Sequence, residues 1–363
     1  MPIRKNTIRV CYVLSYKCPE YVRTGSLIQA LNSISGIEIL KAVNTAVGVW
    51  RYAQTLRRLL ILRAGKDPDC YILGFRGYEI FWIIRILTWG RPLILDHMMS
   101  PYNSLVHEKK LIKEGGVVGR IIHRYERSIL RSADIVLTDT EAHRSYLAGQ
   151  FGVDAGKIHP IPVGADEEVF KPVPAPSYRG KKDLLHVLFY GSFLPLHGIN
   201  IILRAAQILR DRPIRFTLIG GKGRALREFH EMRKGLNLDK VTHKRWVPYE
   251  QIPDLIREAD VCLGGPFGGT GQAGRVITGK TFQSLAMGKP VIVGTTGHDY
   301  GFRDKENCLL VSQGDEEELA RAIRWCLENQ DQLPVLGEHG LQLYRKHFSA
   351  DRIQEILQWI LVP

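Results

Sequence analysis

The sequence of 363 residues has few cysteines, and none of them forms a close pair. The six are scattered at Cys11, Cys18, Cys70, Cys262, Cys308 and Cys326, and no C-x-x-C motif occurs. Disulfide frameworks and structural zinc sites both need cysteines at short, recurring spacings. The cysteine pattern therefore argues against both and favours a reducing compartment such as the cytosol.

Long hydrophobic runs are also missing. The most membrane-like stretch, residues 80–89, is too short to cross a bilayer and contains Arg85. The apolar run at residues 10–14 leads into polar sequence without a cleavage-like site. We therefore expect a soluble or peripheral protein rather than a transmembrane one. Its hydrophobic content of 45% is ordinary, and its length suggests two globular domains.

Acidic residues are scarce at the start of the chain. The first 66 residues contain 11 Lys and Arg but only Glu20 and Glu38, a net +9 out of +13 for the whole chain. Residues 50–66, WRYAQTLRRLLILRAGK, are predicted to form a helix that could lie on an anionic membrane surface. An ordinary domain helix with solvated arginines explains the same pattern. No nucleic-acid partner is expected, because no helix-turn-helix, RNA-binding or zinc-finger signature accompanies the charge.

Short apolar runs alternate with helical stretches along the whole chain. In the first half we predict strands at 8–15, 69–75, 92–97 and 134–139, and helices at 26–34 and 112–132. After a Pro-rich, charged stretch, we predict strands at 185–192, 215–221, 241–247, 260–265 and 291–293, and helices at 199–210, 224–235, 249–259 and 315–329. This alternation is typical of parallel sheets covered on both faces. We expect an α/β protein with two doubly wound halves that face each other across a cleft.

The most informative stretch is RVITGKTFQSLAMGKPVIVG, residues 275–294. Arg275 and Lys280 lie at and before a helix that is predicted to start near Thr278. Backbone amides, the positive end of a helix dipole and two cationic side chains together form an anion site suited to a diphosphate.

Five segments of the second half resemble, in order, the C-terminal domain of GT-B-fold retaining glycosyltransferases of the family-four-like type (glycosyl transferases group 1). They are FYGSFLPLHGINIILRAA, LIGGKG, VPYEQIPDLIREADVCL, KTFQSLAMGKPVIV and ENCLLVSQGDEEELARAI. SILRSADIVLTDTEAHRSYLAGQFGV and KIHPIPVGADEEVFKP in the first half resemble the same family. One motif alone is weak evidence, but five in register are specific.

The resemblance implies a GT-B fold with a definite division of the chain. We expect an acceptor-binding domain at 1–172, a linker at 173–183 and a nucleotide-sugar-binding domain at 184–345. A C-terminal helix at 346–363 is expected to pack back on the first domain.

The same resemblance assigns the donor site. The implied residues are Gly191, Ser192, His197, Gly198, Gly221, Lys222, Val247, Pro248, Arg275, Thr278, Lys280 and Gln283, with Val247 and Pro248 beside the base. Glycines that serve only tight turns are the alternative explanation for the first of these motifs. Because relatives often carry Arg and Lys near Ser192 and His197, their absence here shifts phosphate neutralisation to Arg275 and Lys280.

The chain departs from its apparent family at two positions. Many retaining relatives carry two glutamates eight positions apart, and Arg275 and Gln283 occupy those positions here. Gln283 can still donate to and accept from ribose hydroxyls. Arg275 reverses the sign of the charge, so it can bind a diphosphate but cannot replace a carboxylate toward the sugar.

The first half is expected to supply the acceptor site. His97 and Asp96 follow a predicted strand, and the resemblance makes them the candidate catalytic residues. A histidine that merely caps the strand explains the position of His97 equally well. Arg23, Arg76, Glu79 and Tyr102 are candidate acceptor-binding residues. His123, His143 and His159 lack metal-ligand spacing and are assigned no role.

These expectations combine into one activity. The resemblance implies transfer, with retention, of a sugar from a nucleotide-diphosphate sugar to a hydroxyl of a lipid-linked glycan or cell-envelope polysaccharide precursor. No convincing Asp-x-Asp motif occurs, so we expect neither a metal nor a cofactor beyond the donor. We expect a cytoplasmic protein that could be peripheral at the cytoplasmic face of the membrane, and a small soluble acceptor is the competing view. A GT-B-fold nucleotide-sugar epimerase and a non-catalytic nucleotide-sugar-binding scaffold are the alternatives.

Overall fold

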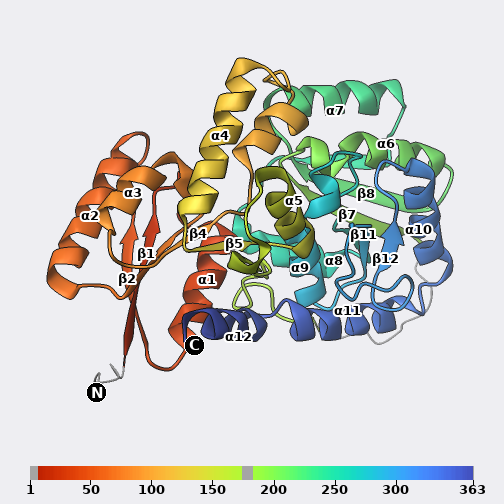
Figure 1. The fold of residues 1–363 in the computed structure, drawn as a ribbon. Coiled ribbons are helices and arrows are strands. Elements are labelled where there is room, and N and C mark those ends of the chain that lie inside the picture. Colours follow the sequence, from red (N-terminus) through yellow and green to blue (C-terminus); the bar gives the residue numbers. More distant parts are fainter. Residues whose placement is uncertain (1–6, 174–182, 363) are drawn as a thin grey trace. The chain divides into compact units, whose positions relative to one another are not determined.

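A computed structural model describes residues 7–173 and 183–362 of the chain. The chain forms two compact units (Figure 1). Unit 1 contains the chain up to Val163 and again from Ala350, and unit 2 contains Gly164–Ser349. The chain therefore passes from one unit to the other twice.

Unit 1 is built on a six-stranded parallel sheet with the order β2-β1-β3-β4-β5-β6. The strands are β1 (Ile8–Leu14), β2 (Ile37–Val43), β3 (Cys70–Leu73), β4 (Leu93–Asp96), β5 (Ile135–Thr138) and β6 (Ile158–Pro160). The helices are α1 (Val22–Ser33), α2 (Trp50–Lys66), α3 (Phe81–Leu87), α4 (Val117–Ser132), α5 (Glu141–Phe151) and α12 (Ala350–Leu361).

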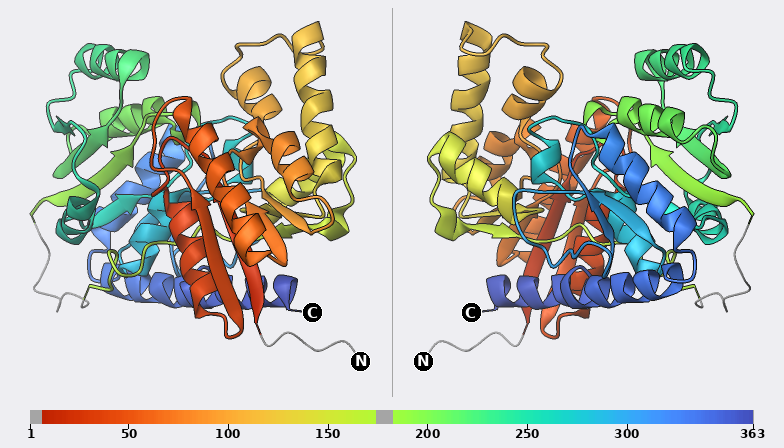
Figure 2. Two further views of the ribbon diagram at one scale, coloured as in Figure 1. Left: turned by 90° about the vertical axis from the view of Figure 1, so that its left-hand side faces the viewer. Right: turned by 90° about the vertical axis from the view of Figure 1, so that its right-hand side faces the viewer.

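Alternate residues of β1 face opposite sides of this sheet, as the two-residue period of a strand requires. Val10 and Leu14 pack with α1 and α12, whereas Val13 packs with α2, α3, α4 and α5. Figures 1 and 2 show α12 beside α1. Leu357 of α12 is fully buried, so this C-terminal helix is part of the hydrophobic core of unit 1.

Unit 2 contains a second six-stranded parallel sheet, with the order β12-β11-β10-β7-β8-β9. Its strands are β7 (Leu185–Gly191), β8 (Ile214–Gly220), β9 (Val241–Lys244), β10 (Val261–Leu263), β11 (Val291–Gly294) and β12 (Leu309–Val311). Its helices are α6 (Ile199–Ile208), α7 (Gly223–Gly235), α8 (Ile252–Glu258), α9 (Gly279–Ala286), α10 (Glu316–Glu328) and α11 (Leu333–His347). The strand order reverses between β7 and β10, and in open α/β sheets ligands bind at the carboxyl ends of strands at such a point.

Several boundaries differ from the sequence-based expectations. α1 begins at Val22, four residues before the expected helix at 26–34, and the segment after β3 contains α3. β2 was not expected, because it is an edge strand with only two buried residues and its pattern is therefore weak. α4 begins at Val117 instead of residue 112.

The division of the chain also falls earlier than expected. Residues 174–182 of the predicted linker lie outside the described residues. The segment just before them belongs to unit 2, where the amide of Val173 donates to the carbonyl oxygen of Met287. Across the described ranges, none of the helices combines the length and apolar character needed to span a bilayer.

Candidate functional site

The carboxyl ends of β7 and β8 meet in unit 2 at a group of closely packed glycines. The amide of Gly221 donates to the carbonyl oxygen of Gly191 over 2.9 Å. Gly221 has a φ of +76°, and a Cβ there would lie 2.4 Å from the Phe193 ring. A Cβ on Gly198 would lie 2.5 Å from the backbone of Phe267. Gly198 and Gly221 are therefore required by the close approach of these loops.

Lys280 lies beside these strand ends in the first turn of α9. Its side chain is buried, and its Nζ atom lies 5.1 Å from the centre of the Phe189 ring. Lys280 makes no ion pair among the described residues. Burial lowers the pKa of its ammonium group from 10.5 to about 7. A lysine held away from water without an acidic partner favours an anionic ligand.

The start of α9 is open in the same place. Thr278 occupies the N-cap position, but its hydroxyl donates to the carbonyl oxygen of Gly264 over 2.6 Å and does not cap the helix. The amides of the first turn, including those of Gly279 and Lys280, are consequently left without a side-chain cap. Together with the helix dipole they offer hydrogen bonds and positive potential to an anion.

His197 flanks the same glycines. The amide of Leu194 donates to His197 Nδ1 over 3.3 Å, an arrangement that leaves the ring proton on Nε2. Burial, and after it the charge of Lys280, holds the pKa of His197 well below 6.5. A Cβ on Gly191 would lie 3.2 Å from the His197 ring and 3.6 Å from Lys280 Nζ. The structure therefore brings Gly191, His197 and Lys280 together.

Gln283, the predicted ribose ligand, is already hydrogen-bonded. Its Oε1 accepts a bond of 2.6 Å from the hydroxyl of Tyr190, and its side chain also interacts with Tyr249. Burial raises the pKa of the Tyr190 hydroxyl well above 10. These two contacts leave part of the hydrogen-bonding capacity of the amide unused.

The remaining predicted donor residues are more open. Arg275 ends a 3₁₀ turn before α9, and its guanidinium lies near Gly271. Lys222 is exposed at the N-cap position of α7. Ser192 and Val247 are half-buried and Pro248 is exposed, all in loops that follow strands.

One element of this site was missed from the sequence. Six glycines lie within residues 264–274, in the loop that joins β10 to the turn before α9. The amide of Gly268 donates to the carbonyl oxygen of Leu196 over 3.0 Å, so this loop packs on the one that holds His197. A glycine-rich run directly after a buried strand is a signal that could have identified it.

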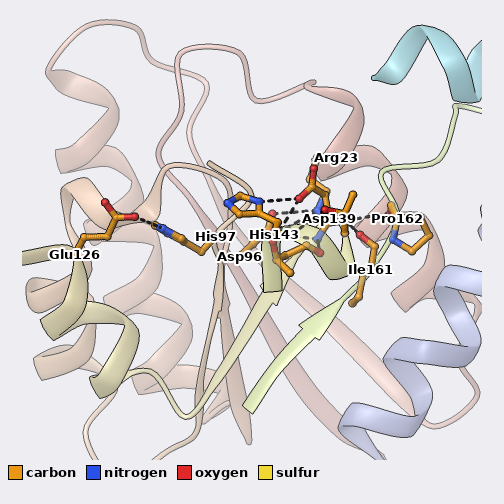
Figure 3. Close-up of polar contacts among 10 residues, drawn as sticks. Arg23, Asp96, His97, Glu126, Asp139, His143, Ile161 and Pro162 are labelled. Atoms are coloured by element: carbon orange, nitrogen blue, oxygen red, sulfur yellow. Dashed lines mark hydrogen bonds and ion pairs between the residues drawn. The ribbon is translucent and has the colours of Figure 1, made fainter. Parts of the chain in front are cut away.

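In unit 1, two of the predicted site residues form an ion pair with each other (Figure 3). Arg23 and Asp96 are both fully buried, and Arg23 Nη2 lies 2.9 Å from Asp96 Oδ1. The same guanidinium donates to the carbonyl oxygens of Thr138, Ile161 and Pro162. Arg23 therefore links the carboxyl ends of β4, β5 and β6, and this explains its burial better than contact with an acceptor does.

His97 follows Asp96 and pairs with a carboxylate on α4. Its Nε2 lies 3.0 Å from Oε1 of Glu126, and both side chains are buried. The other oxygen of Glu126 accepts the amide of Tyr102 over 2.8 Å. His97 Nδ1 is buried and has no hydrogen-bond partner within the described ranges. The Tyr102 ring packs in the hydrophobic core, contrary to its expected place against an acceptor.

A second buried histidine–carboxylate pair was not expected. His143 Nδ1 lies 2.8 Å from Oδ1 of Asp139, at the junction of β5 and α5 (Figure 3). In the part of the chain that the structure describes, His143 Nε2 has no partner. The four-residue spacing of Asp139 and His143 across a strand–helix junction was the available signal.

Arg76 and Glu79 lie together after β3, as expected of residues from one loop. Arg76 Nη2 lies 2.6 Å from Glu79 Oε1, and Arg51 of α2 lies 3.1 Å from the other oxygen. Both predicted residues remain partly exposed and so can reach a ligand. Over residues 7–173 and 183–362, no group of three or more His, Cys, Asp or Glu side chains is arranged to hold a metal ion.

Comparison with known proteins identifies the class. The family model "Glycosyl transferases group 1" matches residues 185–329, and the "Glycosyl transferase 4-like domain" model matches residues 35–164. The two matches together cover most of both units. The chain therefore belongs to the family-4-like group 1 glycosyltransferases.

One curated relative is the D-inositol 3-phosphate glycosyltransferase of Paenarthrobacter aurescens, which is 30% identical over 62% of this chain. The chain spans 55% of the length of that relative.

Solved structures agree on the fold. HepE of Anabaena, in complex with UDP-glucose, superposes with a TM-score of 0.69 at 16% identity, over 97% of this chain and 99% of HepE. The sucrose-phosphate synthase of Thermosynechococcus elongatus gives a TM-score of 0.73 at 18% identity, over 97% and 98% of the two chains. These similarities confirm the predicted two-domain α/β GT-B fold.

Proposed function

We propose that this protein transfers a sugar from a nucleotide-diphosphate sugar to a hydroxyl acceptor. The observation that carries the donor assignment is the buried Lys280, which lies at the open N-terminus of α9 without an ion-pair partner in the described chain. A diphosphate supplies the negative charge that this position lacks. The UDP-glucose bound to HepE supports a donor of this class.

The same groups account for the departure of the leaving group. A nucleoside diphosphate gains negative charge as the glycosidic bond breaks. Lys280, the first-turn amides of α9 and Arg275 stabilise that charge with groups that are already oriented. No metal or further cofactor is needed in this scheme, and the family resemblance supports retention of the anomeric configuration.

In unit 1, we assign the acceptor region to the carboxyl edge of the sheet. His97 Nδ1 is the candidate catalytic atom, with Glu126 fixing the ring through Nε2. Arg76 and Glu79 are the candidate acceptor-binding residues that stay partly exposed.

The acceptor that we propose is a lipid-linked glycan or cell-envelope precursor, used at the cytoplasmic face of the membrane. The excess of basic residues in the first 66 positions supports this choice. An inositol phosphate is the competing acceptor, because a curated relative is named for it.

The donor assignment is tested by calorimetric titration with a panel of nucleotide sugars. Lys280→Met should weaken the binding of the preferred donor by roughly ten- to a hundredfold, the value of a charge-assisted hydrogen bond. Lys234→Met removes an exposed lysine from the end of α7 and is the matched control. Equal donor affinity in Lys280→Met and the wild type would overturn the assignment.

Two further measurements separate the alternatives. Incubation with the donor alone should return it unchanged, whereas an epimerase would release an isomer. Transfer to lipid-linked acceptors and to inositol phosphate should yield product with one class. Tight donor binding with no product from either would favour a non-catalytic scaffold.

A further inference from the structure

The N-terminal end of α4 exposes aliphatic side chains that the proposed transferase chemistry does not use. Leu111 is 71% exposed, Val117 64%, Val118 56% and Ile121 57%. They lie within eleven residues of chain, in the loop before α4 and in its first two turns. Single exposed aliphatic residues are common, whereas four within eleven residues need an explanation.

Basic residues are interspersed with these aliphatic residues in the sequence. Lys109, Lys110, Lys113, Arg120 and Arg124 are all exposed, and the described residues provide none of them with an ion pair. Glu114 is the one acidic residue between positions 109 and 125. We call these five cations and the four aliphatic residues the α4 tip.

The opposite face of α4 shows why the tip stays uncovered. Glu126, Ile129 and Leu130 are buried there, and Glu126 holds His97 and the amide of Tyr102. That face packs in the core of unit 1, whereas Val117, Val118 and Ile121 in the first two turns stay exposed. α4, the yellow helix of Figure 1, therefore has one face that holds the candidate catalytic histidine and another whose apolar and cationic side chains are exposed.

We propose that the α4 tip docks on an anionic lipid surface. Aliphatic side chains between lysines and arginines match a membrane interface. The aliphatic side chains enter the acyl boundary, and the lysines and arginines bind anionic headgroups. A single-stranded nucleic acid would need aromatic stacking platforms, and the tip has none. Because Glu126 lies on the buried face of α4, the membrane contact would lie on the helix that also positions His97.

This surface differs from the helix that the sequence suggested. Three arginines of α2 donate hydrogen bonds to backbone carbonyl oxygens. Arg51 donates to Gly48, and Arg58 donates to Val43. Arg63 donates to Trp89. Three of the five basic residues of α2 thus serve contacts within unit 1. The five cations of the α4 tip remain available to lipid headgroups, and this difference favours the α4 tip over α2.

The biological role of lipid docking rests on the proposed glycosyltransferase function. Binding to lipid can nevertheless be measured without measuring sugar transfer. Co-sedimentation of the full chain with vesicles of phosphatidylglycerol and phosphatidylcholine should show binding that weakens with salt, and vesicles of phosphatidylcholine alone should bind far less. Val118→Ser/Ile121→Ser and Lys109→Gln/Lys110→Gln should each reduce the affinity by roughly tenfold or more.

Leu60→Ser/Ile61→Ser replaces two exposed aliphatic residues of α2 and is the matched control, expected to bind vesicles like the wild type. Loss of binding in this control with retention in the tip variants would overturn the proposal, as would equal binding to neutral vesicles. Sedimentation velocity adds a further check. A dimer that the tip variants dissociate, without vesicle binding, would show that a second copy of the chain covers the tip instead.

Donor titration of the same variants separates the two proposals. The tip variants should keep the donor affinity of the wild type, because the assigned donor residues lie in unit 2, and a urea-unfolding transition like that of the wild type would show that unit 1 is folded. Lys280→Met should lose donor affinity and keep vesicle binding. Failure of the donor titration alone would remove the transferase proposal and leave the lipid surface standing.

Discussion

Binding of the donor should make the protein take up a proton at Lys280. In the ligand-free protein, burial lowers the pKa of this ammonium to about 7. A bound diphosphate favours the charged form and moves the pKa back toward 10.5. Near pH 8 about nine-tenths of the Lys280 side chains are uncharged before the donor binds, so proton uptake on binding approaches one proton. The uptake falls to about half a proton near pH 7 and to about a tenth of a proton near pH 6.

Calorimetry in buffers of different ionisation enthalpy measures this uptake directly. A nucleotide sugar is the suitable ligand, because its esterified diphosphate carries no proton that titrates near neutral pH. Lys280→Arg keeps the positive charge at every pH and should abolish the uptake. No uptake near pH 8 in the wild type, or the same uptake in Lys280→Arg, would refute the reasoning.

The same lysine should control stability in the absence of ligand. The folded-state pKa of Lys280 lies below its unfolded value of 10.5, so between about pH 7 and 10.5 the unfolded chain binds more protons. Stability then rises with pH across this window, and the full destabilisation is present below pH 7. Lys280→Met should raise the free energy of unfolding near pH 6 by a few kcal/mol, and the gain should shrink toward pH 10. Urea unfolding at the two pH values provides the measurement.

Three more changes test the geometry. Arg23→Leu leaves Asp96 as a buried, unpaired charge and should cost roughly 3–5 kcal/mol in urea unfolding, part of which Arg23→Leu/Asp96→Asn recovers. Glu126→Gln keeps the size of the side chain but weakens its hold on His97, so kcat should fall while donor affinity stays unchanged. Gly198→Ala drives a Cβ into the loop at Phe267 and should weaken donor binding in calorimetry by about tenfold or more.

Local pattern predicted much of unit 2, because its inner strands are continuously apolar and its glycines follow them directly. β7 was expected at 185–192 and ends at Gly191, and the helix expected near Thr278 begins at Gly279. α2 occupies the predicted residues 50–66. In these segments the periodicity and the helix-start signals agree with the tertiary fold.

The pairings in unit 1 could not be predicted in the same way. Arg23 and Asp96 are 73 positions apart, and His97 and Glu126 are 29 apart. No rule of sequence spacing predicts that such distant residues pair, because the order of the strands in the sheet decides which helix and strand ends lie side by side. Arg23 and Asp96 are therefore polar residues with the composition of a site but a positioning role in the fold.

Lys280 and the residues around Arg23 differ in how their charge is balanced, and this difference separates ligand-binding from positioning roles. Arg23 is buried with a carboxylate and three carbonyl oxygens around it, so the folded chain already satisfies its charge. Lys280 is buried with a benzene ring beside it and, among the described residues, no carboxylate in an ion pair. A buried charge that the chain satisfies stabilises the fold, whereas one that it leaves unsatisfied lowers stability until a ligand of opposite charge arrives. Arg275, at the end of the 3₁₀ turn before α9, is the second cation that we propose for the diphosphate.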